Sequence, residues 1–187
     1  MELVLDLKKR YTIADYLTWA DDVRRELIDG FIKLFPAPSP LHADVTGNVY
    51  SSLKVNNKKD GLRVFIAPVD VFFFDDTLEK GHTVVQPDVL ITTEDRVTEK
   101  GIIGPPLLIV EVLSKKNRKN DLVDKLFLYR KYAVKQYWIC NPRTKTVEVF
   151  LHDGEDFKDS IEFGIGDKIQ FIMNGVQFEI LVDVIFI

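Results

Sequence analysis

The chain has 187 residues, of which 46% are apolar and 29% charged, a balance typical of a folded globular protein and not of a disordered one. Its 25 basic and 29 acidic residues give a net charge of −4, which excludes binding to nucleic acid through an overall positive field. No stretch without Asp, Glu, Lys or Arg exceeds ten residues, so we expect no membrane-spanning segment, which needs about 18 apolar residues. The single cysteine, Cys140, excludes an intramolecular disulfide and favours a cytoplasmic location.

The first third of the chain predicts two helices separated by a β-hairpin. Residues 11–24 are expected to form a helix, with Thr12 as N-cap and an acidic residue three positions later in a capping-box arrangement. Residues 26–35 consist of two short apolar runs around Asp29-Gly30, a pair typical of a tight hairpin turn. Residues 40–57 are expected to form the second helix, because apolar residues recur there every four positions.

The rest of the chain is rich in short apolar runs that predict strands, with one helix among them. The predicted strands lie at residues 63–69, 70–74, 83–93, 107–113, 136–140 and 146–151, followed by further short runs up to residue 187. Residues 120–133 place apolar side chains on one face and are expected to form the third helix. This order predicts an α/β fold of the α+β, mixed-sheet type. It consists of a central mixed β-sheet flanked by helices, with an N-terminal hairpin and C-terminal β additions, in a single domain of residues 1–187.

Two acidic residues lie among apolar neighbours. Asp88 follows Pro87, and Glu111 lies inside the apolar run 107–113. An unpaired carboxylate there is costly to desolvate, so each needs a cation, a hydrogen-bond donor or a metal. Each also has a purely structural interpretation, since Pro-Asp is common in turns and Glu111 fits an edge strand or an ion pair. Together, on neighbouring strands, they offer the hard oxygen ligands that Mg²⁺ or Mn²⁺ binds along with water and a substrate phosphate.

Three further side chains are candidates beside this acidic pair. Lys125 lies in the predicted helix that follows the Glu111 strand, although an ion pair with Asp121 on a solvated face is the more common role for such a lysine. Ser114, just past the strand, is placed either to bind a phosphate or to form a turn. His42 opens the second helix, either near the site or as a cap or surface residue.

Basic residues are clustered despite the acidic net charge. One group consists of Lys54, Lys58, Lys59 and Arg63, and a second group, directly after Ser114, consists of Lys115, Lys116, Arg118 and Lys119. Because phosphate contacts are made by individual side chains, such a local group is sufficient to bind a nucleic-acid backbone. Exposed loops that are simply basic are the more common explanation of such runs.

The chain has no G-x-S-x-G, Walker or G-x-G-x-x-G motif, which counts against an α/β-hydrolase, a P-loop NTPase and a dinucleotide-binding protein. Six segments, in this order, instead resemble the restriction-endonuclease-like PD-(D/E)xK superfamily and, more narrowly, the Uma-type family of predicted bacterial endonucleases. The segments are Glu26-Leu27-Ile28-Asp29-Gly30, Pro38-Ser39-Pro40-Leu41-His42, Val84-Val85-Gln86-Pro87-Asp88, Glu111-Val112-Leu113-Ser114, Asp121 with Lys125 and Tyr129, and Tyr137-Trp138-Ile139-Cys140-Asn141-Pro142.

The chain departs from the family pattern at four positions. Leu113 stands where the superfamily signature has its lysine, and the resemblance implies that Lys125 on the adjacent helix supplies the ammonium instead. Ala133 replaces the usual Gly before the Tyr-Trp strand, and Asn141 replaces the usual Asp. Lys115 replaces the usual Pro, which makes this loop more basic than is typical.

The resemblance implies an endonuclease that uses Mg²⁺ or Mn²⁺ to hydrolyse DNA phosphodiester bonds. Asp88, Glu111 and a backbone carbonyl, expected from Val112, would hold the metal, while Lys125 would orient or deprotonate the attacking water. Glu26 is a candidate for a further acidic residue of the site. The predicted substrate-contacting residues are Ser114, Lys115, Lys116, Arg118, Lys119, His42 and Gln86.

An alternative of a different class is a non-catalytic module that kept the nuclease fold to bind nucleic acid or protein. The acidic net charge and the displaced lysine favour this alternative. We also expect a homodimer, because duplex cleavage by one site per chain favours two copies related by a two-fold axis. The run Phe72-Phe73-Phe74 and residues 184–187 are apolar and offer surface for such contacts.

Overall fold

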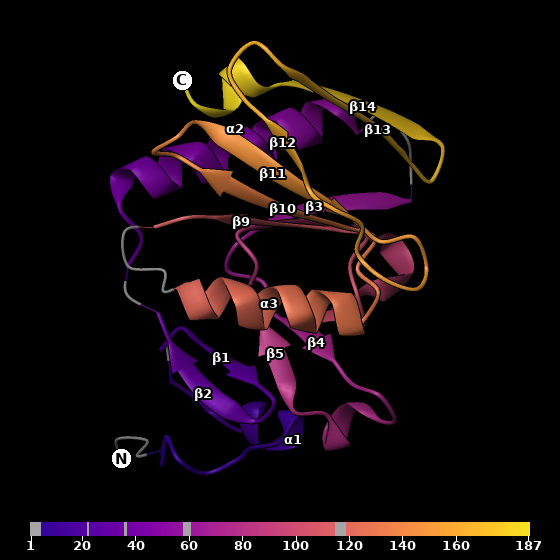
Figure 1. The fold of residues 1–187 in the computed structure, drawn as a ribbon. Coiled ribbons are helices and arrows are strands. Elements are labelled where there is room, and N and C mark those ends of the chain that lie inside the picture. The colour runs from indigo at the N-terminus through magenta and orange to yellow at the C-terminus, as the bar shows by residue number, and fades with distance from the viewer. Residues whose placement is uncertain (1–4, 22, 36, 58–60, 115–118) are drawn as a thin grey trace.

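The computed structural model describes the chain except residues 1–4, 22, 36, 58–60 and 115–118, and the side chains of residues 119–121 are also left undescribed. The described residues form two six-stranded sheets, a two-stranded hairpin and three α-helices. Figure 1 shows these elements in layers. One sheet is covered by α2 and the C-terminal hairpin on its outer face, and α3 lies between the two sheets. Helix α1 lies at the far end, beneath the sheet that contains the N-terminal hairpin. The predicted fold class is therefore confirmed.

The first helix begins as predicted but is much shorter. Thr12 caps α1 (Ile13–Tyr16), and its side chain and that of Asp15 bond reciprocally to each other's backbone N–H, which confirms the capping box. The helix does not continue to residue 24, because the Asp15 carbonyl accepts from the backbone N–H and the hydroxyl of Thr18 and not from the Trp19 N–H that the next helical bond would use. The Trp19 N–H bonds to Tyr16 instead, and the chain leaves the helix there.

The predicted hairpin is confirmed. Strands β1 (Arg25–Ile28) and β2 (Phe31–Leu34) pair antiparallel around Asp29-Gly30. Both turn residues have positive φ, 49° and 85°, as a two-residue turn of this kind requires. A side chain at Gly30 would also place its Cβ 2.9 Å from the Tyr11 carbonyl oxygen, so the position needs glycine for two reasons.

The second helix also agrees with its prediction. Helix α2 spans Pro40–Asn56, with Ser39 as N-cap and Pro40 in the first turn. Its buried face consists of Val45, Thr46, Val49 and Leu53. The apolar members of this face pack in one cluster with the adjacent sheet and the C-terminal hairpin.

The strands form two sheets where a single one was predicted. The first sheet has the order β2-β1-β5-β4-β8-β7, and the second has the order β12-β11-β10-β9-β6-β3. In chain order the strands after β2 are β3 (Leu62–Ile66), β4 (Val71–Phe73), β5 (Thr83–Val85), β6 (Val89–Thr93), β7 (Val97–Thr98), β8 (Gly101–Ile103), β9 (Leu108–Val112), β10 (Gln136–Asn141), β11 (Thr146–Leu151) and β12 (Ile161–Phe163). The hairpin β13 (Lys168–Met173) and β14 (Val176–Leu181) follows, and short 3₁₀ turns lie at η1 (Leu78–Lys80), η2 (Glu94–Arg96) and η3 (Val182–Ile185).

The predicted strand at residues 83–93 is in fact two strands that belong to different sheets. Strand β5 pairs with β1 and β4, whereas β6 pairs with β3 and β9. The break falls at Gln86-Pro87-Asp88, where proline has no N–H to contribute to a ladder. The chain thus crosses from one sheet to the other within three residues, directly before the start of β6.

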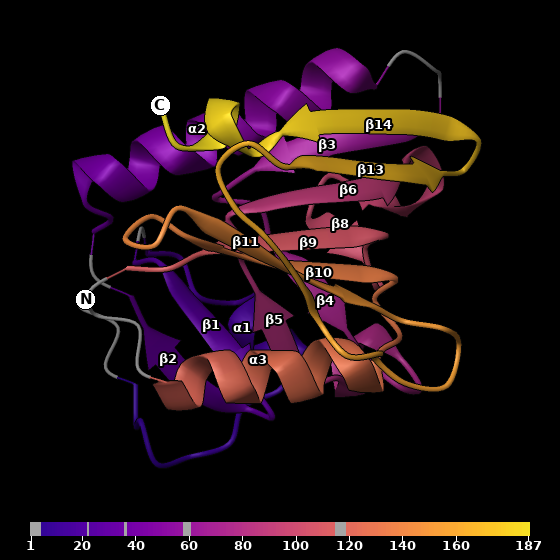
Figure 2. The same ribbon diagram turned by 45° about the horizontal axis from the view of Figure 1, so that its top comes forward.

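Helix α3 (Lys119–Lys131) connects β9 to β10, which run parallel, as such a crossover requires. Figure 1 shows it between the two sheets, and Figure 2 shows it in front of β1, β2 and β5. Its buried residues Leu128 and Tyr129 pack against side chains of both sheets, including Phe73 of β4 and Ile109 of β9. The helix therefore holds the two sheets together.

The apolar runs proposed as a dimer surface are largely core. Phe72 and Phe73 are fully buried, so the prediction that this run offers contact surface is wrong for these two residues. At the C-terminus Ile185 and Phe186 are buried, whereas Ile187 is 90% exposed. Among the described residues, no helix is long and apolar enough to cross a membrane.

Candidate active site

Four buried ionisable side chains from four separate elements meet at the boundary between the two sheets. Glu26 comes from β1, Asp88 from the crossing before β6, Glu111 from β9 and Lys125 from α3. Their residues are 2%, 6%, 6% and 4% exposed, so all four have left bulk water. We call them the carboxylate–lysine site. Residues that lie up to 99 positions apart in the chain are brought together there.

Lys125 is the central cation of the site. Its Nζ lies 2.8 Å from Glu111 Oε1 and 3.2 Å from Glu26 Oε1. The Tyr129 hydroxyl, one helical turn further along α3, donates to the same Glu111 oxygen at 2.9 Å. One face of α3 thus orients Glu111, as two donors spaced four residues apart on a helix can.

Asp88 is held through one of its two oxygens. Its Oδ2 accepts a hydrogen bond from the backbone N–H of Val112 at 2.8 Å and lies 3.1 Å from His42 Nε2. Val112 neighbours Glu111 in the sequence, so this bond ties the two acidic residues together. Val112 was predicted to ligate a metal through its carbonyl oxygen. Its N–H serves Asp88, and the role of the carbonyl stays a prediction.

Helix α2 presents His42 to the site. The Ser39 hydroxyl caps the helix by accepting from the His42 N–H, which sets the backbone of the first turn. The Thr46 hydroxyl donates to the His42 carbonyl and lies 3.4 Å from the imidazole Nδ1. His42 was left open between a site residue and a cap. The structure makes Ser39 the cap and places the imidazole against Asp88.

The electrostatics of the site follow from burial and from the excess of carboxylates. Burial raises the pKa of the Glu111 carboxyl to about 7, the neighbouring carboxylates of Asp88 and Glu26 act in the same direction, and the Lys125 ammonium opposes them. Burial alone would lower the pKa of Lys125, but the charges of Glu111 and Glu26 outweigh it and raise this pKa above its usual value. The hydrogen bond to Asp88 raises the pKa of His42.

The donor set fits a magnesium-type ion. Glu26 Oε2 is buried without a hydrogen-bond partner, which is costly unless a cation or water reaches it. Glu26, Asp88 and Glu111 together carry more negative charge than Lys125 alone can balance. Within the described part of the chain, no group of three or more His, Cys, Asp or Glu residues is placed to hold a metal ion by itself. Mg²⁺ is bound through one or two carboxylates and completes its shell with water and phosphate.

Sequence reasoning missed Arg24, which lies at the edge of the site. Its Nε donates to Gln86 Oε1 at 3.0 Å and its Nη2 to the Gln86 carbonyl at 3.2 Å. Gln86, predicted to contact substrate, uses its side-chain amide to bridge Arg24 and Asp70, and its backbone N–H donates to Glu26 Oε1 at 2.8 Å. A signal was present, because Arg24 precedes Glu26 by two residues and alternate residues of an extended chain share a face.

Most of the predicted basic substrate contacts cannot be placed. Lys115, Lys116 and Arg118 lie outside the described residues, and Lys119 begins α3 with an undescribed side chain. The side chain of Asp121, the alternative partner of Lys125, is likewise outside them. Ser114 follows β9 and is half-buried.

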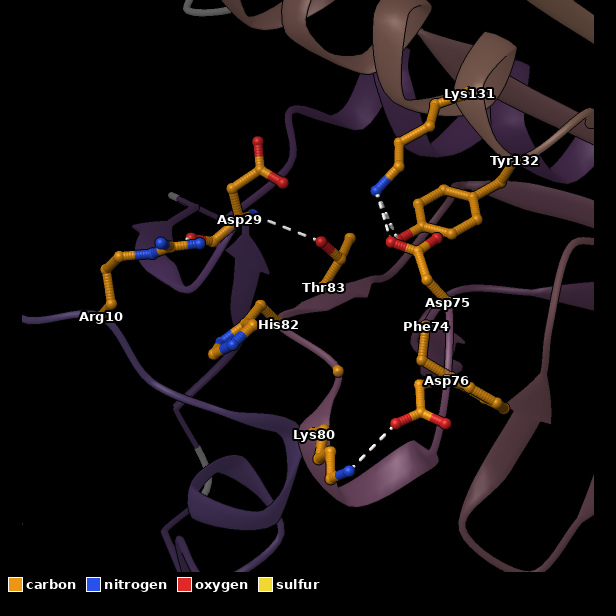
Figure 3. Close-up of a pocket in the computed structure, with 11 residues that line it drawn as sticks. Arg10, Asp29, Phe74, Asp75, Asp76, Lys80, His82, Thr83, Lys131 and Tyr132 are labelled. Atoms are coloured by element: carbon orange, nitrogen blue, oxygen red, sulfur yellow. Dashed lines mark hydrogen bonds and ion pairs between the residues drawn. The ribbon is translucent and has the colours of Figure 1, made fainter.

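A separate hollow of about 220 Å³ lies beyond the carboxylate–lysine site, between the β1–β2 turn, the segment after β4 and the end of α3. Figure 3 shows two ion pairs among its side chains, Lys131 with Asp75 at 2.9 Å and Lys80 with Asp76 at 3.0 Å. Asp75 and Asp76 are thus paired with exposed lysines. This distinguishes the hollow from the carboxylate–lysine site.

Comparison with known proteins decides the family. Residues 13–170 match the Uma2 family, whose description is "putative restriction endonuclease". The chain belongs to the Uma2 family. All four members of the carboxylate–lysine site lie inside the matched range.

The fold of this Uma2 protein is also that of a solved structure. It superposes with a TM-score of 0.73 on the crystal structure of a "putative nuclease belonging to DUF820" from Anabaena variabilis, at 18% sequence identity. The superposition covers 94% of this chain and 97% of the other. No curated protein matches the chain.

Proposed function

We propose that the protein is a divalent-metal-dependent endonuclease that hydrolyses phosphodiester bonds of DNA at the carboxylate–lysine site. One observation carries the proposal: buried Lys125 lies within hydrogen-bonding distance of two carboxylates, next to a third from the adjacent strand. Three buried carboxylates share two basic partners, because Lys125 contacts Glu26 and Glu111 and His42 contacts Asp88. Such an excess of buried carboxylates is expensive for the fold and favours a functional role. Membership of the Uma2 family supports the same conclusion.

Asp88 and Glu111 are the residues that would hold the metal. Glu26 contacts Lys125 and is a further acidic residue of the site. When bound, a divalent ion would offset the negative charge of the phosphate and make water a better nucleophile at neutral pH. The fixed carboxylates require no rearrangement of strands to provide these ligands, because each is already bound by a backbone or side-chain donor.

The protein's own groups would orient the substrate and manage protons. Lys125 is a compact cation with three donors, two of which the carboxylates use, so a third can face a phosphate oxygen or the attacking water. Burial raises the pKa of Glu111 to about 7 without a metal, and a bound divalent cation would oppose this effect and favour the ionised form that serves as a ligand. His42, whose pKa is raised by Asp88, offers a second hydrogen-bond donor, next to the Asp88 carboxylate.

A cleavage assay tests the proposal. Plasmid and single-stranded DNA would be incubated with Mn²⁺ or Mg²⁺ and with wild-type, Lys125→Ala or Lys131→Ala protein. Lys131 is the matched control, since it lies on the same helix but pairs with Asp75 at the surface. We expect metal-dependent nicking by the wild type and by Lys131→Ala, and a loss of at least a hundredfold in Lys125→Ala. Equal activity of all three proteins would reject the assignment.

The non-catalytic alternative makes a different prediction for the same samples. A module that only binds would retain DNA and leave it intact with every metal. The internal bonds of Lys125 to Glu111 and Glu26 are the observation in its favour, because they satisfy the lysine without any ligand. DNA retention without cleavage by the wild type would support this alternative.

A further inference from the structure

Arg24 directs its side chain to the same side of the chain as Glu26. It lies immediately before β1, where successive side chains alternate between the two faces. Its neighbour Arg25 takes the opposite face, where it pairs with Asp21 at 2.7 Å and lies 5.2 Å from the Trp19 ring. The two adjacent arginines therefore have different tasks, and only Arg24 faces the crossing that carries Asp88.

The guanidinium of Arg24 is held without being neutralised. Both of its hydrogen bonds go to neutral oxygens of Gln86, and within the described residues it has no carboxylate at ion-pair distance. A guanidinium has five donor hydrogens in a planar fork, and these two bonds leave others free. Half-buried, positively charged and partly unused, Arg24 is suited to receive an anion.

The orientation of Gln86 is determined by two residues behind it. Its Nε2 donates to Asp70 Oδ1 at 2.8 Å, and the Tyr16 hydroxyl donates to the same Asp70 oxygen at 3.0 Å. Asp70 can only accept, so the amide nitrogen of Gln86 must point to it and the amide oxygen must point to Arg24. Gln86 therefore cannot flip without losing both contacts.

We propose that Arg24 binds a phosphate oxygen of the DNA backbone at the carboxylate–lysine site, and that Gln86 is the positioning residue that fixes its guanidinium. The inference rests on the proposed nuclease function. Gln86 precedes Asp88 by two residues and its N–H binds Glu26, so the backbone that carries the metal-type carboxylates also positions Arg24. A planar fork there complements the point charge of Lys125, because it can bind two oxygens of one phosphate.

The first test measures DNA affinity without cleavage. A fluorescein-labelled duplex would be titrated in Ca²⁺ with wild type, Arg24→Ala, Arg24→Lys and Arg130→Ala, with anisotropy recorded at several salt concentrations. Arg130 is the control, since it lies exposed on α3 and pairs with Asp156. We expect Arg24→Ala to weaken binding roughly tenfold and to lower the salt slope by about one, and Arg24→Lys to restore the slope but not the full affinity.

The results for Arg24→Ala and for the wild type test the role of Arg24 and the proposed nuclease function separately. If the wild type binds or cleaves DNA and Arg24→Ala behaves like Arg130→Ala, the role of Arg24 is wrong while the nuclease proposal stands. If the wild type neither binds DNA in Ca²⁺ nor cleaves it in Mn²⁺, the proposed function itself fails and the inference fails with it.

The second test asks whether Gln86 acts through Arg24. Gln86→Leu would be measured in the wild-type and Arg24→Ala backgrounds, by anisotropy and by thermal melting. If Gln86 only positions Arg24, its substitution weakens DNA binding several-fold in the first background and has no effect on affinity in the second. A structural role would lower the melting temperature and reduce affinity by the same factor in both backgrounds, and that result would overturn the positioning role.

Discussion

Asp88 is anchored through a single oxygen, by the Val112 N–H and by His42. At a pH above the raised pKa of His42, where the imidazole is neutral, an asparagine here can keep both hydrogen bonds and removes one of three buried negative charges without breaking an ion pair. We expect Asp88→Asn to melt in EDTA at the wild-type temperature or slightly above it, because like charges in the metal-free site repel. In Mg²⁺ the wild type should gain stability, by about 2.7 kcal/mol when the metal is at a hundredfold its Kd, and the variant should gain none.

Thermal melts of both proteins in EDTA and in Mg²⁺ check this prediction. A turn-forming or purely ion-paired Asp88 would instead make the variant less stable by about 1–3 kcal/mol in both buffers. Equal destabilisation in the two buffers would therefore exclude a metal ligand.

Ala133 ends α3 in a conformation that favours glycine. Its φ is 52°, and the bonds Val134 N–H to the Tyr129 carbonyl and Ala133 N–H to the Arg130 carbonyl form a Schellman motif. The family pattern has glycine at this position. We expect Ala133→Gly to raise the free energy of unfolding by about 0.5–1 kcal/mol, measured by urea denaturation.

Ala43→Gly is the matched control for this change, because Ala43 is exposed inside α2 and has no positive φ. The same substitution there should lower stability by about 1 kcal/mol. A loss of stability in both variants would show that Ala133 is not strained.

Asp70 gives the fold a pH dependence of known sign. Burial raises its pKa, against the opposing hydrogen bonds from Gln86 and Tyr16. The folded protein therefore keeps this proton to a higher pH than the unfolded chain, so the stability that Asp70 contributes is complete at low pH and is lost as pH rises through the elevated pKa. The loss is about 1.4 kcal/mol for each unit by which the pKa is raised.

Asp70→Asn keeps an acceptor for both donors but does not titrate. We expect its free energy of unfolding relative to the wild type to increase as pH rises from about 4 to about 7. Urea denaturation of both proteins at each pH measures this difference. A difference that stays constant, or that changes in the opposite direction, would contradict the raised pKa.

Among the elements, α3 carries two lysines, Lys125 and Lys131, whose contacts with carboxylates differ in burial and hence in energy. Lys125 is buried between two carboxylates, whereas the Lys131 side chain is 52% exposed beside Asp75. We expect Lys125→Met to cost about 3–5 kcal/mol in unfolding free energy, because it leaves buried carboxylates without their cation. Lys131→Met should cost less than about 1 kcal/mol, and a similar loss from both variants would show that Lys125 is not the central cation of the fold.

Local signals predicted the elements whose cause is local. The Asp29-Gly30 turn, the helix start at Pro40 and the Thr12 capping box each depend on residues within a few positions, and the structure confirms all three. The predicted length of α1 was wrong, and the break at Pro87 was missed. Pro87 is a local signal for the break, since proline has no N–H for a ladder. That the strands on either side join different sheets depends on distant partners, and no local pattern carries that information.

The sequence identified several residues of the site but not all of the contacts between them. Asp88, Glu111 and Lys125 were selected as chemically unusual or motif-matched residues, and the structure brings Glu111 and Lys125 into contact and joins Asp88 to Val112. The contacts of His42 with Asp88, and of Arg24 with Gln86, connect residues 46 and 62 positions apart. Nothing in the neighbouring sequence specifies such pairs, because the first follows from how α2 packs beside β6 and the second from the pairing of β1 with β5.

For the whole molecule, we expect a two-fold symmetric dimer in solution. Each chain has one carboxylate–lysine site, whereas a duplex has two strands to cut. With Phe72 and Phe73 in the core, the predicted contact surface is reduced to half-buried Phe74 and to Val184 and Ile187, which are exposed. Light scattering should give a mass of twice the 21.5 kDa chain, and a concentration-independent mass of a single chain would refute the dimer.

The three-residue crossing at Gln86-Pro87-Asp88 has a consequence for how activity can be lost. Glu26 belongs to one sheet, Asp88 and Glu111 to the other, and Lys125 to the helix between them. Neither half of the molecule contains the site by itself. The site is therefore a property of the docked assembly, and it disappears as soon as the sheets part, even while each keeps its own ladder of hydrogen bonds. In the proposed nuclease, DNA cleavage would therefore be lost when the two sheets separate, before the secondary structure melts.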